Sequence, residues 1–153
     1  DLDAIVVPMG GGSCITGAVL ALRTLRPDVQ IIGVQSERAP ALANSLKSGE
    51  LQQCDSADTF ADGLAARVAF ELPFSILKDQ VDDVVLLTED EMREAVRVAL
   101  ETTHNVAEGA AAAAYAAAIK LRQKLAGKRV VIVHSGQNID RNTLRWALGL
   151  FDA

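Results

Sequence analysis

Short apolar segments recur along the chain, and longer segments with helical spacing separate them. The apolar segments are rich in β-branched side chains, as is typical of strands buried on both faces of a parallel sheet. We predict strands at Ala4–Val7, Gln30–Val34, Val84–Leu87 and Val130–Val133. Strands that alternate with helices predict an α/β fold, with a mostly parallel open sheet and helices on both faces.

The segment from Cys14 to Arg26 predicts the first helix. Its apolar residues, Leu25 among them, recur every three or four positions, and Pro27 ends the helix because proline cannot continue it. The region 39–78 has weaker periodicity and several glycines and prolines. We therefore expect it to form helices and loops along the edge where the strands end.

Three later segments also predict helices. Thr88 and Glu91 have the spacing of a capping box at the start of one helix. The segment Gly109–Leu125 is alanine-rich, so its helix can lie close to the sheet. Asp140 can cap a last helix whose apolar residues extend to Phe151. Right-handed crossovers place the carboxyl ends of parallel strands at one edge, and ligands of such sheets bind there.

Composition limits the classes of protein that fit this pattern. The 153 residues are 50% apolar and 23% charged, which predicts one soluble α/β domain over residues 1–153. A net charge of −5 and only 4% aromatic residues argue against nucleic acid or an anionic membrane as a partner. Cys14 and Cys54 lie far apart, without metal-site spacing, and no signal peptide or membrane span is evident. These features indicate a cytoplasmic protein with reduced thiols.

A glycine-rich turn follows the first predicted strand and leads into the first predicted helix. Gly10, Gly11, Gly12 and Ser13 form this turn. Glycines let backbone N–H groups approach a phosphate closely, and the helix start adds free N–H groups and the positive end of the helix dipole. The turn therefore predicts a phosphate site; the alternative is a tight turn that binds no ligand.

Common phosphate and nucleophile motifs do not match this turn. The Walker motif needs a lysine that the residues after Gly12 do not supply. The dinucleotide motif, and a nucleophile elbow around Ser13, both need glycine where Ile15 stands. The sequence therefore gives little support to a nicotinamide dehydrogenase or a serine hydrolase.

Several short motifs occur in a fixed order along the chain. In order they are Val7–Ser13 with Gly17, Ala61–Gly63, Val81–Asp83, Thr88–Glu91, Glu108–Ala110 and Ser135–Asn138. Together they resemble the C-terminal half of a fold-type-II pyridoxal-phosphate enzyme of the threonine/serine dehydratase and serine racemase group. The resemblance covers almost the whole chain. It implies the large-domain portion of the tryptophan synthase β-like fold, and pyridoxal 5′-phosphate as the cofactor.

The resemblance also implies cofactor contacts. The glycine turn would bind the 5′-phosphate; its last residue is serine here, and serine can still donate its N–H if its backbone needs no positive φ. A serine after the last strand would meet the pyridine nitrogen, and a neutral hydroxyl there suits β-elimination better than transamination. The residues implied in cofactor binding are Gly10, Gly11, Gly12, Ser13, Asp62, Gly63, Glu108, Ser135 and Gly136.

Plain structural roles remain open for several of these positions. Glu108 can be a charge partner of a helix start, and Asp62 with Gly63 can form a simple turn. His134 stands where the family usually has an apolar residue; we expect local hydrogen bonds for it rather than an acid/base role. Cys14 could have a lowered pKa at a helix start, but we expect a small packed thiol.

Two kinds of residue that the family uses are missing. Where some members bind a divalent cation, this chain has Gln35 and Ala41, and Glu37 alone is a poor ligand set, so we expect no metal site. The covalent cofactor lysine of the family lies in a Ser-x-Lys-x-Arg-like context upstream of the glycine turn. No lysine here has that context, and surface charge is the expected role of Lys47, Lys78, Lys120, Lys124 and Lys128.

The chain begins at Asp1, directly before a core strand. We expect it to be part of a longer enzyme whose N-terminal half carries the lysine, and to be inactive alone. The predicted reaction is β-elimination from L-threonine or L-serine to a 2-oxo acid and ammonia. The alternatives are a serine racemase or other β-replacing enzyme, and a non-catalytic phosphate-binding or interaction module. We also expect homo-oligomers, because a missing half would leave apolar surface exposed.

Overall fold

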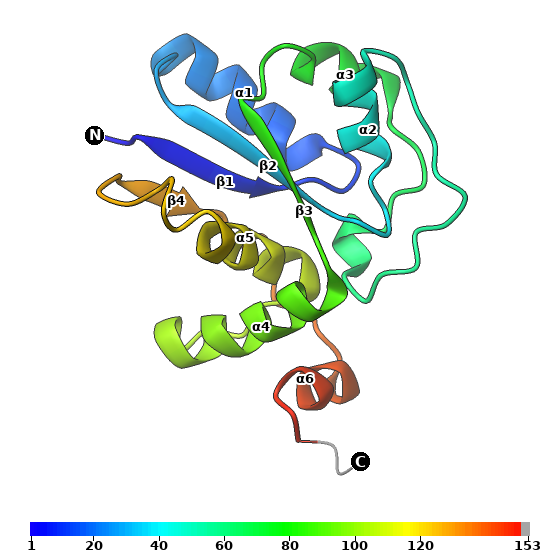
Figure 1. Ribbon diagram of the computed structural model, residues 1–153, viewed down its shortest axis with the longest axis vertical. Coiled ribbons are helices and arrows are strands. Elements are labelled where there is room, and N and C mark those ends of the chain that lie inside the picture. Colours follow the sequence, from blue (N-terminus) through cyan, green and yellow to red (C-terminus); the bar gives the residue numbers. More distant parts are fainter. Residues whose placement is uncertain (151–153) are drawn as a thin grey trace.

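The computed structural model describes residues 1–150, and its centre is a four-stranded parallel sheet. The strands lie in the order β3-β2-β1-β4 (Figure 1). Their bounds are β1 Ala4–Pro8, β2 Gln30–Ser36, β3 Asp83–Leu87 and β4 Val130–Ile132. Every neighbouring pair is parallel, which confirms the predicted α/β class.

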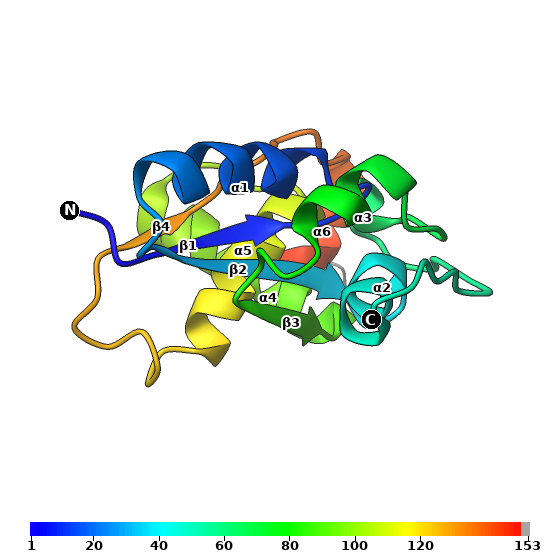
Figure 2. The same cartoon turned by 90° about the horizontal axis from the view of Figure 1, so that it is seen from above.

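Helices cover both faces of this sheet, as Figure 2 shows. One face carries α1, and the other carries α4 and α5, while α2 and α3 lie near the carboxyl ends of the strands. Helix α6 packs on α4. The helical elements are α1 Ser13–Leu25, α2 Ala41–Ser48, the 3₁₀ turn η1 Asp62–Leu64, α3 Glu71–Leu77, α4 Glu89–Thr103, α5 Gly109–Lys120 and α6 Arg141–Ala147.

Alternate side chains of the central strands enter two separate cores. Ala4 and Val6 of β1 belong to the core under α4 and α5, whereas Val7 and Ile31 belong to the core under α1. All four are fully buried. Because both faces of the central strands are covered, their sequences are continuous apolar runs rather than alternating ones.

The outer strands are less buried than the pattern predicted. Val131 of β4 is 43% exposed and Leu86 of β3 is 38% exposed, so the prediction of burial on both faces is wrong for these two strands. Val131 is in register with Ile5 and therefore faces the α1 side of the sheet. Helix α1 packs on β1 and β2, which leaves Val131 beyond its cover.

The predicted helix starts of α4 and α6 are confirmed. The Thr88 hydroxyl accepts a hydrogen bond from the Glu91 amide at 3.1 Å, and the Glu91 carboxylate accepts one from the Thr88 amide at 2.9 Å. The Asp140 carboxylate accepts the Asn142 amide at 2.8 Å. Phe151, predicted on the apolar face of the last helix, lies outside the described residues.

Two details of the predicted helices are wrong. Helix α5 ends at Lys120 rather than Leu125, because the amide of Arg122 bonds to the carbonyl of Ile119, three residues back, in a tighter turn. Leu25, predicted on the buried face of α1, is 74% exposed. Across the described part of the chain, no helix is both long and apolar enough to cross a membrane.

Candidate functional site

A small cavity of about 180 Å³ lies where β1 and β4 end. The glycine turn, the η1 turn, the start of α5 and the segment after β4 all contribute to it. It is lined by Pro8, Gly10, Gly11, Gly12, Ser13, Cys14, Gly63, Glu108, Ala110 and Ser135. The segments that follow β1 and β4 therefore meet at one cavity, at the edge where the carboxyl ends of the strands were expected to lie together.

The glycine turn presents free backbone donors. Gly12 is the N-cap of α1, with φ of 96°, and no side chain caps this helix. Within residues 1–150, the amides of Gly10, Gly11 and Gly12 donate to no protein acceptor, and the first turn of α1 carries no acidic residue. Ser13 is not among the residues with positive φ, so serine fits this position. The arrangement suits an anion such as phosphate.

Glycines let the separate segments of the site touch. A Cβ on Gly10 would lie 2.0 Å from the Gly63 carbonyl oxygen, and a Cβ on Gly63 would lie 2.8 Å from the Cβ of Ala110. Real Cβ atoms do not approach other atoms this closely. The glycine turn, the η1 turn and the start of α5 therefore form one packed unit.

Glu108 joins the start of α5 to the segment after β4. Its amide donates to the Gly136 carbonyl at 3.1 Å, and its carboxylate accepts the Asn138 amide at 2.9 Å. A Cβ on Gly136 would lie 2.5 Å from the Glu108 carboxyl carbon. Although Glu108 is the N-cap of α5, its side chain forms no cap bond to that helix. The carboxylate faces the cavities rather than the helix amides.

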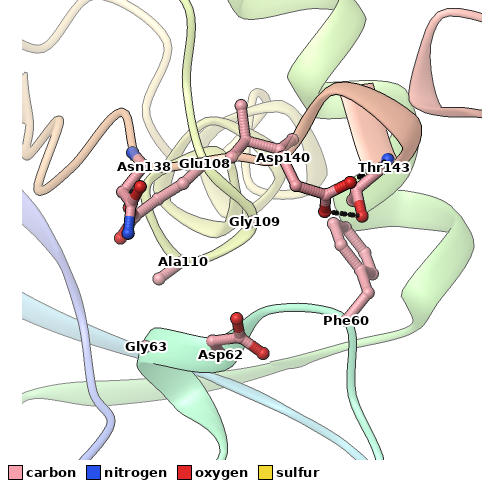
Figure 3. Close-up of a pocket in the computed structure, with 10 residues that line it drawn as sticks. Phe60, Asp62, Gly63, Glu108, Gly109, Ala110, Asn138, Asp140 and Thr143 are labelled. Carbon is pink, nitrogen blue, oxygen red and sulfur yellow. Dashed lines mark hydrogen bonds between the residues drawn. The ribbon is translucent and has the colours of Figure 1, made fainter. Parts of the chain in front are cut away.

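A larger cavity of about 510 Å³ adjoins the first and shares Gly63, Glu108 and Ala110 with it. Figure 3 shows Asp62 across the hollow from Asn138 and Asp140. In the described part of the chain the Asp62 carboxylate has no hydrogen-bond or ion-pair partner. The Thr143 hydroxyl, together with the amides of Thr143 and Asn142, lowers the pKa of Asp140. This cavity is therefore polar and acidic on its walls.

The end of β4 places Ser135 in the smaller cavity. Its hydroxyl has no partner among the described residues. His134 Nε2 lies 3.1 Å from the Val106 carbonyl oxygen, and His134 Nδ1 lies 3.1 Å from the Tyr115 hydroxyl. The expected local hydrogen bonds of His134 are confirmed.

Cys14 differs from its prediction. The residue is exposed and lines the smaller cavity, so the expectation of a packed thiol is wrong. It follows Ser13 at the start of α1, where its side chain points out of the core. The surrounding protein still desolvates the sulfur, and this raises the pKa of the Cys14 thiol.

The residues at the family's cation position make protein contacts. Gln35 is fully buried, and its carbonyl oxygen accepts the Ala43 amide at 2.8 Å. Glu37 is exposed and lines a different groove. Over residues 1–150, no three His, Cys, Asp or Glu side chains gather as a metal site would need.

The lysines of the chain lie away from both cavities. Lys120 pairs with Glu91 at 2.9 Å, and Lys124 pairs with Asp83 at 2.7 Å. Lys78 donates to the Gly49 carbonyl. Each of these contacts lies on the surface.

Sequence reasoning missed part of the cavity walls. Phe60, Asn138 and Thr143 line the larger cavity, and Phe70 supports the glycine turn because a Cβ on Gly11 would lie 3.2 Å from its ring. Asn138 stands within the last motif and could have been named from it. The others carry no local signal, because only the folded chain brings them to the site.

Comparisons with known proteins agree with this geometry. The family model described as pyridoxal-phosphate dependent enzyme matches residues 1–136. The chain is 39% identical to the L-threonine ammonia-lyase of Thermotoga maritima, over 94% of this chain and 36% of that protein. It is 37% identical to the catabolic L-threonine dehydratase of Escherichia coli, over 100% of this chain and 47% of that protein. The chain thus spans less than half the length of these relatives.

Solved structures of other proteins also resemble the fold of this chain. The processed form of threonine deaminase isoform 2 from Solanum lycopersicum has a TM-score of 0.90 and 30% identity, over 98% of this chain and 44% of that one. Serine racemase from Dictyostelium discoideum has a TM-score of 0.83 and 34% identity, over 92% and 45%. The chain belongs to the family of pyridoxal-phosphate dependent enzymes.

Proposed function

We propose that residues 1–153 are part of an ammonia-lyase that uses pyridoxal phosphate to convert L-threonine or L-serine into a 2-oxo acid and ammonia. The observation that carries the proposal is the convergence of the glycine turn, Gly63, Glu108 and Ser135 on one cavity with free amide donors. The relatives named L-threonine ammonia-lyase favour this reaction. When bound, the cofactor supplies an electron sink for the substrate's α-carbon.

The glycine turn would hold the phosphate group of the cofactor. Its amides have no competing protein acceptor, and the start of α1 adds further donors. Charge-assisted hydrogen bonds from amides to a phosphate are stronger than neutral ones. The Ser13 hydroxyl can add one more donor at the same place.

Ser135 would face the ring nitrogen. Its hydroxyl is free of protein partners and can donate to an unprotonated nitrogen, which leaves the ring a weaker acceptor of charge. A fast expulsion of the β-hydroxyl tolerates such a ring. Glu108 would keep this wall of the cavity in place through Gly136 and Asn138.

The remaining catalytic parts would lie elsewhere in the parent enzyme. No lysine lines either cavity, and the chain spans 36% to 47% of the two curated relatives described above. We infer that the covalent lysine and the groups that bind the substrate carboxylate come from the other half. The two free cysteines suit the cytoplasm, which is the compartment we propose.

The test is an absorbance titration with pyridoxal phosphate, followed by borohydride reduction and peptide mapping. It compares residues 1–153 with the longest translation product of the gene that contains them. We expect a reducible imine and threonine deamination only in the longer product. Specific trapping on a lysine of residues 1–153, or deamination by this chain alone, would contradict the proposal.

A racemase or another β-replacing enzyme is the second candidate. The similarity to serine racemase favours it, because the fold and the site wall are common to both kinds of enzyme. Incubating the longer product with L-serine and assaying both pyruvate and D-serine separates them. We expect pyruvate as the main product.

A further inference from the structure

The segment after β4 has two sides with different contacts. His134, Gly136 and Asn138 each bond to the stretch 106–108: the His134 ring to the Val106 carbonyl, the Gly136 carbonyl to the Glu108 amide, and the Asn138 amide to the Glu108 carboxylate. Ser135, between the first two, instead lines the smaller cavity. Only the His134 contact is made by a side chain; Gly136 and Asn138 use backbone groups. The side chains of His134 and Ser135, two successive residues, thus have different surroundings, as along an extended backbone.

The His134 side chain contacts both α5 and the loop that precedes it. Its ring lies edge-on to Tyr115 of α5, with centroids 5.9 Å apart and planes at 88°. A carbonyl oxygen only accepts hydrogen bonds, so His134 Nε2 carries a proton toward Val106. In the neutral ring, Nδ1 then accepts the Tyr115 hydroxyl proton. One side chain thus ties the end of β4 to α5 and to the stretch that leads into Glu108.

The Ser135 hydroxyl has no protein partner, so its position depends on the backbone that carries it. Its immediate neighbour His134 fixes that backbone at one end, and the Gly136–Glu108 bond fixes it at the other. Neither Tyr115 nor Val106 lines the smaller cavity. A change there would reach the cofactor through Ser135.

We propose that His134, held by Tyr115 and Val106, is a positioning residue that aligns the Ser135 hydroxyl with the ring nitrogen of the cofactor. The proposal rests on the proposed function, because it needs pyridoxal phosphate in the cavity. An apolar side chain at position 134 would satisfy packing alone, whereas His134 adds two hydrogen bonds that hold the backbone of Ser135.

The experiment uses the longest translation product that contains these residues, loaded with pyridoxal phosphate. His134→Phe keeps a ring of similar size and removes both hydrogen bonds. We expect it to raise the Kd of the cofactor about tenfold, the size of effect given by one or two lost hydrogen bonds. We also expect the absorption spectrum of the bound cofactor to move toward that of Ser135→Ala. Tyr115→Phe removes one bond and should give a smaller change in the same direction.

A double variant separates positioning from general stability. In the Ser135→Ala background, His134→Phe should cause no further change in the cofactor spectrum, because the hydroxyl that it aligns is already gone. His104→Asn is the matched control. His104 is exposed at the end of α4 with φ of 58°, which asparagine tolerates, so the spectrum should not change.

Two results would overturn the inference. One is a His134→Phe protein with lower thermal stability but the wild-type cofactor spectrum and Kd. The other is a spectral effect of His134→Phe that persists at full size in the Ser135→Ala background. If the wild-type product binds no pyridoxal phosphate, the proposed function fails and this inference fails with it. If His134→Phe does not fold, Tyr115→Phe decides by the same criteria.

Discussion

Gly10 and Gly17 lie seven positions apart but have very different surroundings. A Cβ on Gly10 would overlap the Gly63 carbonyl oxygen at 2.0 Å, whereas a Cβ on Gly17 in α1 would meet nothing within 4 Å. We expect Gly10→Ala to destabilise the fold and to weaken phosphate and cofactor binding. Gly17→Ala should stabilise the fold by about 0.5–1 kcal/mol, because alanine favours the helix.

Thermal unfolding and titration with pyridoxal phosphate test both changes. Equal effects of the two substitutions would contradict the close approach of the glycine turn and the η1 turn. Gly17 is the control because it belongs to the same motif but not to the cavity wall.

At the scale of single residues, the sequence was a good guide to glycines and a poor one to side-chain exposure. Gly12 adopts a positive φ at the start of α1 and Ser13 does not, so the condition set for serine at this position is met. Cys14 is exposed, and Phe60 reaches the larger cavity from a loop far along the chain. Such placements depend on which distant segments pack together, and no local pattern reports them.

Among the helices, α4 offers a test of pH dependence. Burial alone would raise the pKa of Glu91, but the Thr88 amide bond and the Lys120 ion pair outweigh it and lower the pKa overall. The carboxylate is therefore more stable ionised in the folded state than in the unfolded state. Its contribution to stability is present at neutral pH and is lost as the pH falls through the lowered pKa.

We expect Glu91→Gln to cost about 0.5–1 kcal/mol at pH 7, and this difference should disappear in acid. Denaturant unfolding at a series of pH values measures it. Glu94→Gln is the control on the same helix: it removes an exposed pair with Arg97 but no cap bond, and should cost about 0.3 kcal/mol. A difference for Glu91→Gln that grows in acid would contradict the assigned pKa direction.

The alanines of α5 test how closely this helix packs. Ala113 is fully buried in the core that α4 and α5 form with the sheet, whereas Ala118 is only partly buried. We expect Ala113→Leu to destabilise the chain by about 1–3 kcal/mol, because the added atoms have no space. Ala118→Leu should have a smaller effect. Urea unfolding of both variants is the measurement, and equal costs would contradict the close packing.

At the scale of elements, the helix caps and the central strands were predictable from the sequence. The end of α5 and the exposure of the outer strands were not. Thr88 and Asp140 carry their cap signals in their own side chains. The exposure of Val131 depends on how far α1 extends across the sheet, and α5 ends at Lys120 where the chain enters a tighter turn. The repeating alanines after Gly109 contain no signal for the point where the helix stops.

For the whole molecule, the two sheet edges differ. On β3, Lys120 donates to the Leu86 carbonyl at 3.1 Å and Lys124 pairs with Asp83. Strand β4 pairs only with β1 in the described part of the chain, and Val131 is exposed on it. Open apolar strand edges promote association between chains.

We therefore expect residues 1–153, expressed alone, to self-associate, and the oligomer fraction to grow as the protein concentration rises. Val131→Lys should reduce this association, because a lysine on an edge strand disfavours pairing of that strand with another chain. Thr102→Lys on the exposed side of α4 is the control and should have no effect. Sedimentation velocity over a range of concentrations measures all three proteins. A wild-type chain that stays monomeric would contradict the expectation.

The close approaches around the cavity also limit how this site can evolve. The backbone oxygen of Gly63 leaves no space for one added methyl group on Gly10, whereas the atoms nearest to Gly136 belong to the flexible side chain of Glu108. We expect a substitution at Gly10 to require a shift of the η1 backbone, which a single inherited change does not supply. We therefore expect inherited changes to be tolerated more readily at the exposed Ser13 and Ser135 than at Gly10.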